Sequence, residues 1–99
     1  MKIVFIVHVE YCSARVMEIF NAVGIDYYTR WEQAKGKGHG TDPHLGTGSF
    51  PSTNSVVMVA FEEEKPLAKL IDAITAANAD IKRPADRIRL FQVPLDRIV

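Results

Sequence analysis

Two apolar runs constrain the fold of this 99-residue chain more than any other feature. They are KIVFIVHV (residues 2–9) and SVVMVAFE (residues 55–62), and both are rich in the residues that favour β-strands. Apolar side chains occupy both sets of alternate positions: in the first run, Ile3, Phe5 and Val7 on one side and Val4 and Ile6 on the other. A strand with one face in water would alternate apolar and polar residues. We therefore expect both faces of the sheet to be covered.

The segments around these runs predict two helices and two further strands. Ser13 can cap a helix that ends at Gly24, and Pro66 suits the first turn of a second helix. Further strands are predicted from Ile25 to Gln33, where residue types alternate, and from Arg87 to Val93. The buried positions recur at helical spacing: Val16, Ile19, Phe20 and Val23 in the first helix, and Leu67, Leu70, Ile71 and Ile74 in the second.

The resulting order is strand, helix, strand, strand, helix, strand. It is typical of the ferredoxin-like βαββαβ fold of the α+β class, an antiparallel sheet with two helices on one face. In this chain a long loop separates strands 2 and 3. Since the composition has no break, we expect a single domain over residues 1–99.

The two helices can cover only one face of this sheet, although both faces are apolar. Leaving a large apolar side chain in water forgoes roughly 1.5–3 kcal/mol of burial free energy. An exposed apolar patch usually marks an interface. We therefore expect an oligomer whose sheet faces pack together, with any ligand site between subunits.

The segment from Ala34 to Asn54 contains five of the six glycines. A turn of about two to five residues would suffice between two neighbouring strands, and loops as long as this one usually have a function or are disordered. In the motif KGKGHG, glycines let backbone N–H groups approach an anion, and Lys35 and Lys37 add positive charge. The spacing matches neither a Walker A loop nor a dinucleotide fingerprint.

A second basic cluster precedes and enters the last strand. Its members are Lys82, Arg83, Arg87 and Arg89. The pattern leaves open whether these residues bind an anion or form an ordinary solvated edge.

Composition excludes several classes of function. The formal net charge of zero argues against a nucleic-acid-binding protein or a polybasic membrane anchor. The apolar N-terminal run is too short to span a bilayer, so we expect no membrane insertion. The single cysteine, Cys12, can form no internal disulfide, which favours the cytoplasm. No catalytic triad or isolated pair of carboxylates is evident, and we expect no enzyme.

Cys12 and His8 each have an alternative to a functional role. Cys12 and Arg15 lie where the first helix begins, so the thiol is either reactive, with a lowered pKa, or a small, partly buried residue. His8 alternates with apolar residues and is expected to be a core or interface histidine whose hydrogen bonds are satisfied.

Three stretches make the sequence similar to the PII signal-transduction family, and especially to its divergent PII-like branch. They are VMEIFNAVGI at the end of the first helix, AKGKG leading into the long loop, and NSVVMVAFEEE leading out of it. The similarity runs over nearly the whole chain. One departure is DIKRPADR (residues 80–87), which replaces the glycine-rich turn of that family.

This resemblance implies a homotrimer with its sheets facing the threefold axis and adenine nucleotides bound in the clefts between subunits. Residues 35–54 correspond to the family's flexible T-loop, which inserts into a regulated partner such as a membrane transporter or an enzyme. The resemblance and the basic motif together give the candidate nucleotide-binding residues: Thr29, Lys35, Gly36, Lys37, Gly38, Arg87 and Arg89. We expect ligand binding to order a tip formed by residues 41–53.

A different class of function is a cytosolic metal sensor or carrier. His39, Asp42 and His44 lie within six residues and offer the nitrogen and oxygen atoms that zinc, copper or nickel accept. A neighbouring chain could complete such a divalent metal site. A small ferredoxin-like enzyme acting on an acyl phosphate is a third alternative.

Overall fold

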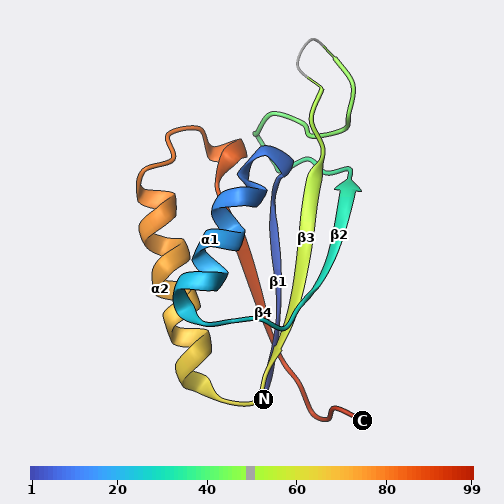
Figure 1. Cartoon of the computed structure of the whole chain (residues 1–99). Coiled ribbons are helices and arrows are strands. Elements are labelled where there is room, and N and C mark those ends of the chain that lie inside the picture. The colour runs from blue at the N-terminus through green and yellow to red at the C-terminus, as the bar shows by residue number, and fades with distance from the viewer. Residues whose placement is uncertain (49–50) are drawn as a thin grey trace.

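The structure, a computed structural model, describes residues 1–48 and 51–99 and has the element order βαββαβ (Figure 1). The strands are β1 (Lys2–Val9), β2 (Thr29–Ala34), β3 (Asn54–Phe61) and β4 (Arg89–Pro94); the helices are α1 (Ser13–Val23) and α2 (Glu64–Ala79). Two short 3-10 helices, η1 (Glu10–Cys12) and η2 (Pro84–Asp86), follow β1 and precede β4. The predicted ferredoxin-like fold is confirmed.

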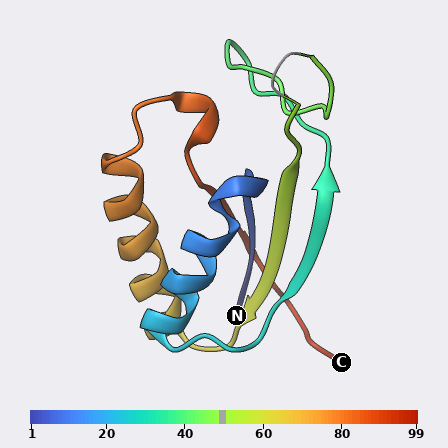
Figure 2. The same ribbon diagram turned by 45° about the horizontal axis from the view of Figure 1, so that its top comes forward.

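The four strands form one sheet in the order β2-β3-β1-β4, and all neighbouring strands are antiparallel. Both long helices lie on the same face of the sheet (Figures 1 and 2). The long loop between β2 and β3 lies at one end of the sheet, together with η1 and η2. The connection from α1 to β2 lies at the opposite end.

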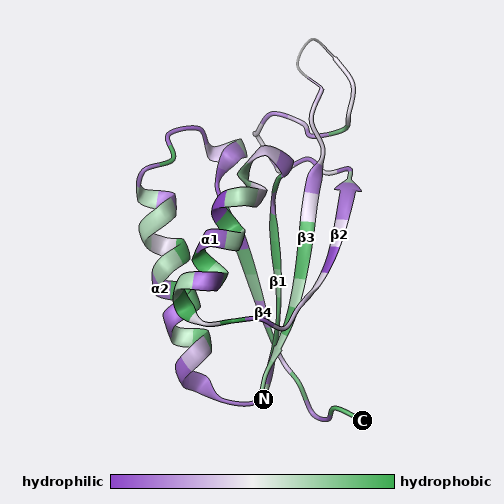
Figure 3. Ribbon diagram, viewed as in Figure 1, coloured by the Kyte–Doolittle hydropathy of each residue, from purple (hydrophilic) through white to green (hydrophobic). Residues whose placement is uncertain are grey.

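The core lies between the helices and the sheet. Val4 and Ile6 of β1 and Val57 and Val59 of β3 point to the helices and are fully or almost fully buried. They pack against the apolar side of each helix, and Figure 3 shows hydrophobic residues following β1 and β3. The helical residues in this core are Val16, Phe20, Leu67, Leu70, Ile74 and Ala77.

Gly24 ends α1 as predicted. Its φ of +80° lies in the left-handed region that glycine adopts readily, and its N–H donates to carbonyls of the last turn. The predicted cap at Ser13 is wrong, because η1 runs directly into α1. Ser13 is the first residue of the helix, and Cys12 occupies the cap position without a side-chain hydrogen bond.

The second strand begins at Thr29, four residues later than predicted. The aromatic residues before it pack on the core instead of pairing with β3. Tyr28 lies edge to face with Phe20, with ring centroids 5.6 Å apart, and Tyr27 lies edge to face with Phe61 at 6.1 Å. The alternating residues from Ile25 to Gln33 therefore include a linker that packs on the core as well as most of β2.

The last strand begins at Arg89 and not at the predicted Arg87. The reason is that Pro84 starts η2, and Arg87 forms its C-terminal cap in an extended conformation. The side chain of Asn78 then binds both backbone polar groups of Ile88, at 2.8 Å to the N–H and 2.7 Å to the carbonyl.

The face of the sheet that the helices leave uncovered, here called the open face, is apolar as predicted. Phe5 lies between Met58 of β3 and Phe91 of β4, and Trp31 pairs with Val56. The side chains of Trp31 and Phe91 remain 47% and 50% exposed. Within this chain, large apolar surface is therefore left in contact with water.

Candidate functional site

The first part of the long loop folds back on itself. Gly36 and His44 form an isolated antiparallel bridge, with hydrogen bonds of 3.0 Å from the Gly36 N–H and 2.8 Å from the His44 N–H. Residues 36–44 therefore form a closed lobe, called the lobe below. A side chain at position 36 would lie 2.6 Å from Nδ2 of Asn54, so the amide of Asn54 would have to move to admit one.

Glu10 holds both arms of the long loop at its base. Its N–H donates to the carbonyl of Thr53 at 2.9 Å, and its carboxylate accepts a hydrogen bond of 2.5 Å from the Gln33 N–H. Gln33 has a φ of +59°, which is uncommon for a residue other than glycine, at an irregularity in the pairing of β2 with β3. No sequence motif distinguished Glu10 before the fold was known.

The segment between α2 and β4 (residues 80–88), called the connection below, forms the opposite wall of the site. It contains η2, and the Nε of Arg87 donates to the carbonyl of Ile81 at 3.3 Å. Because Asn78 fixes Ile88, the last turn of α2 also fixes the start of β4. Arg87 and Arg89 are therefore presented from a segment that is anchored on both sides.

A pocket of about 400 Å³ lies between the lobe, the connection and the end of β1. Three cationic side chains line it: Lys37 from the lobe, Arg87 from the connection and Arg89 from β4. Asp42 contributes the carboxylate among the lining side chains. With three cations, one carboxylate and the backbone of Gly38, the pocket has the chemistry of an anion site.

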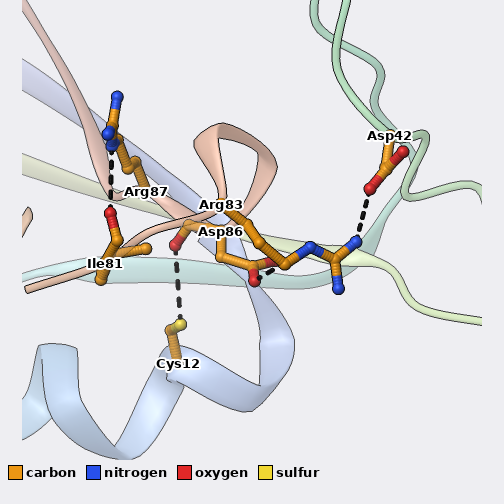
Figure 4. A network of polar contacts seen from close by, with 6 residues as sticks. All are labelled: Cys12, Asp42, Ile81, Arg83, Asp86 and Arg87. Carbon is orange, nitrogen blue, oxygen red and sulfur yellow. Dashed lines mark hydrogen bonds and ion pairs between the residues drawn. The ribbon is translucent and has the colours of Figure 1, made fainter.

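A polar network ties the lobe to the connection (Figure 4). Arg83 forms an ion pair with Asp42 of the lobe, and its Nε lies 3.8 Å from the carboxylate of Asp86. The hydrogen bond with Asp42 is the main cause that raises the pKa of Arg83 above its ordinary value. The Cys12 thiol donates to the carbonyl of Asp86 at 3.8 Å, so η1 also belongs to this network.

The structure brings together most of the residues named from the sequence. Those that line the pocket are Gly36, Lys37, Gly38, Arg87 and Arg89, together with His39, Asp42 and His44. Two of the named residues do not line it. Lys35 lies between β2 and the lobe, and Thr29 lies opposite Met58 on the open face.

The predicted metal set is not assembled within one chain. In residues 1–48 and 51–99, no three histidine, cysteine or carboxylate side chains lie close enough to hold a metal ion. Asp42 is instead paired with Arg83. Residues 49 and 50, which fall in the predicted loop tip, lie outside the described residues.

Buried polar atoms beside the pocket were missed by the sequence reasoning. His8 is 2% exposed and its Nδ1 bonds the carbonyl of Val9 at 2.8 Å, but its Nε2 has no partner within the described chain. His8 is therefore a core histidine, one of the two positions expected for it, and the bonding of its Nε2 stays a prediction. Ser55, its cross-strand neighbour, and Asn54 also have side-chain oxygens without a hydrogen bond to the described residues of this chain.

Cys12 fits the second of its two alternatives. Its side chain is partly buried, and desolvation, followed by the charge of Asp86, raises the pKa of the thiol. Arg15 acts in the opposite direction but is the smaller cause. The nearby Tyr11 is similarly affected, because burial and then a hydrogen bond to Asp86 raise its pKa to about 12.

Among the described helices, none is long and apolar enough to cross a membrane. No family model matches the sequence, and the search of curated proteins also found no match. Solved structures with a similar fold include three of CPII, a nitrogen regulatory PII-like protein from Thiomonas intermedia K12.

The three CPII structures differ in their ligands. The first, bound to ADP, AMP and bicarbonate, gives a TM-score of 0.68 at 16% sequence identity. The second, bound to ADP and bicarbonate, gives 0.68 at 14%, and the third, bound to ADP, AMP and acetate, gives 0.61 at 14%. Each comparison covers 97% of this chain and 88% of CPII.

The resemblance predicted from three short stretches is thus confirmed as a likeness of fold over nearly the whole chain. At 14–16% identity the likeness concerns the path of the backbone. The chain has the fold of the nitrogen regulatory PII-like proteins.

Proposed function

We propose that this chain is a PII-like regulator and not an enzyme. It binds an adenine nucleotide or another small anion in the pocket between the lobe and the connection. Ligand binding changes the conformation of the loop at residues 35–54, and the loop then controls a protein partner, either a membrane transporter or an enzyme. The whole chain, residues 1–99, acts as one PII-like domain.

One observation is the main support for this proposal: Lys37, Arg87 and Arg89 converge on one pocket from separate segments. Like charges repel, so three cations with a single carboxylate favour an anion that offsets the repulsion. The backbone N–H of Gly38 lies in the same wall and can bind a phosphate oxygen, whereas the N–H of Gly36 is bonded to the carbonyl of His44. CPII, which has the same fold, is bound to ADP in three structures.

The proposed assembly is a homotrimer in which neighbouring chains cover the open face. Thr29 supports a shared site, because it lies on the open face and does not line the pocket of its own chain. A neighbouring copy could bring its Thr29 to the ligand. The apolar residues Phe5, Trp31 and Phe91 supply the surface that such an interface would bury.

The proposal is tested by titrating ADP into the protein in a calorimeter. We expect Arg87→Gln and Arg89→Gln each to weaken binding by roughly tenfold to a hundredfold, because each removes a charged contact worth about 1.5–3 kcal/mol. Arg97→Gln is the control, since it removes the same charge in the C-terminal tail at the opposite end of the sheet. If Arg87→Gln and Arg89→Gln both bind ADP as tightly as Arg97→Gln, this pocket is not the nucleotide site.

Divalent metals belong in the same titration because the sequence also named His39, Asp42 and His44. Zinc or copper binding that is lost in His39→Ala and His44→Ala would favour the sensor alternative. Since one chain does not assemble three ligands in the described residues, such a site would need a second copy.

A further inference from the structure

Asp42 is out of place in an anion site. The other charged side chains that line the pocket, Lys37, Arg87 and Arg89, are cations. A carboxylate beside them lowers the positive potential that an incoming phosphate would meet. The sequence predicts Asp42 as a metal ligand, whereas in the structure it forms an ion pair with Arg83.

Asp42 also joins two parts of the molecule that are far apart in sequence. It lies on the returning arm of the lobe, and its partner Arg83 lies just before η2 in the connection (Figure 4). Among the hydrogen bonds and ion pairs of the described residues, this pair is the one that ties the lobe to the connection. Apart from it, backbone bonds between Gly36 and His44 close the lobe at its base.

The ion pair is suited to exchange. Both side chains are 65% exposed, and exposed pairs contribute little to stability because water and salt screen them. Arg83 has a second carboxylate nearby, Asp86, at 3.8 Å. When Asp42 leaves, Arg83 therefore keeps a partner in the connection.

We infer that Asp42 is an internal competitor of the anionic ligand and latches the lobe to the connection until that ligand binds. This inference rests on the proposed function, because it takes the pocket to be the anion site. An anion that enters between Lys37, Arg87 and Arg89 repels the Asp42 carboxylate. The lobe moves away from the connection, and the bond to Arg83 breaks.

Linkage then gives the inference a measurable consequence. If anion binding opens the latch, weakening the latch must tighten anion binding, by at most the factor by which the closed latch reduced it. Asp42→Asn keeps the size of the side chain, removes its charge and weakens the bond to Arg83. Asp42→Asn is therefore expected to tighten anion binding, whereas the loss of a metal ligand would weaken metal binding.

The test compares Asp42→Asn with Asp26→Asn by calorimetric titration of ADP into the assembled protein. Asp26 is exposed in the segment that joins α1 to β2, at the far end of the sheet from the pocket. Its substitution makes the same change in net charge as Asp42→Asn. We expect Asp42→Asn to bind ADP about twofold to tenfold more tightly than the wild type and Asp26→Asn to bind it equally. Equal or weaker binding by Asp42→Asn, in a protein whose wild type binds ADP, overturns the competition.

A second measurement does not depend on the ligand. The Asp42–Arg83 pair and the Gly36–His44 bridge hold the same lobe, so loss of the pair should let the bridge open more often. In the protein without nucleotide, NMR hydrogen exchange of the Gly36 and His44 amides reports that opening. Both Asp42→Asn and Arg83→Gln should exchange faster than the wild type, whereas Asp26→Asn should not. Exchange at the wild-type rate in both latch variants overturns the latch. Failure of the wild type to bind ADP would instead contradict the proposed function.

Discussion

At the residue scale, short-range chemistry was readable from the sequence, and long-range pairing was not. Gly24 was identified as the end of a helix because only the local backbone matters there. The partners Asp42 and Arg83 are 41 residues apart, and no periodicity connects them. The Nε2 of His8 has no hydrogen-bond partner among the described residues, and this follows from which residues pack around it in the fold. The pattern of apolar neighbours in the sequence could not reveal it.

His8 should make the stability of the protein depend on pH. Desolvation is the main cause that lowers its pKa below 6.5 in the folded protein. The unfolded chain then binds more protons than the folded one near and below pH 6.5, so stability is complete above the unfolded pKa and is lost as pH falls through it. We expect the urea concentration at the midpoint of unfolding of the wild type to decrease as the pH is lowered from about 7.5 to about 5.5.

His8→Gln should lose part of this pH dependence, because glutamine does not titrate. His39→Gln is the control: His39 is exposed in the lobe, and the variant should keep the dependence of the wild type. An unchanged dependence in His8→Gln would show that the buried imidazole is not its source.

At the element scale, strands were predicted best where apolar residues fill them. The strands predicted from the two apolar runs, β1 and β3, fell within one residue of their observed bounds. The bounds of β2 and β4 were less accurate, because Tyr27 and Tyr28 pack on the core and Pro84 starts η2. The pocket forms where the lobe and the connection come close together in the fold. No local sequence pattern could predict this contact.

Asn78 offers a test of how the connection is held. Its side chain makes two hydrogen bonds to Ile88, so Asn78→Ala should lower the free energy of unfolding by about 2 kcal/mol, at about 1 kcal/mol for each bond. The same change should weaken ADP binding, because Arg87 and Arg89 flank Ile88. Urea unfolding and calorimetry measure the two effects.

Asn21→Ala is the matched control, since Asn21 is exposed on α1. It should leave ADP binding unchanged and, because alanine favours helices, should not destabilise the protein. If Asn78→Ala behaves like this control in both measurements, the side chain of Asn78 does not position the connection.

At the scale of the whole molecule, the open face is the feature that requires explanation. The sequence already indicated it, because apolar residues filled both sides of the first and third strands. The structure adds that Trp31, Phe91 and Val93 are each close to half exposed on that face. The proposed assembly would connect this surface to the pocket, because sister chains would cover the face and their contacts would complete the site.

A charge on this face should prevent assembly. Trp31 lies opposite Val56, is 47% exposed and does not line the pocket, so Trp31→Asp would place a carboxylate in the proposed interface alone. Ile98→Asp is the control, because Ile98 is 49% exposed in the C-terminal tail, after the last residue of β4. We expect Trp31→Asp to be a monomer and Ile98→Asp to assemble as the wild type does.

Native mass spectrometry of the wild type at micromolar concentration, with and without ADP, shows whether the chains assemble and whether assembly goes with ADP binding. We expect a complex of three chains that gains up to three ADP molecules, and single chains without ADP for Trp31→Asp. A wild-type protein that remains a single chain and binds ADP no better than Trp31→Asp would contradict the shared site.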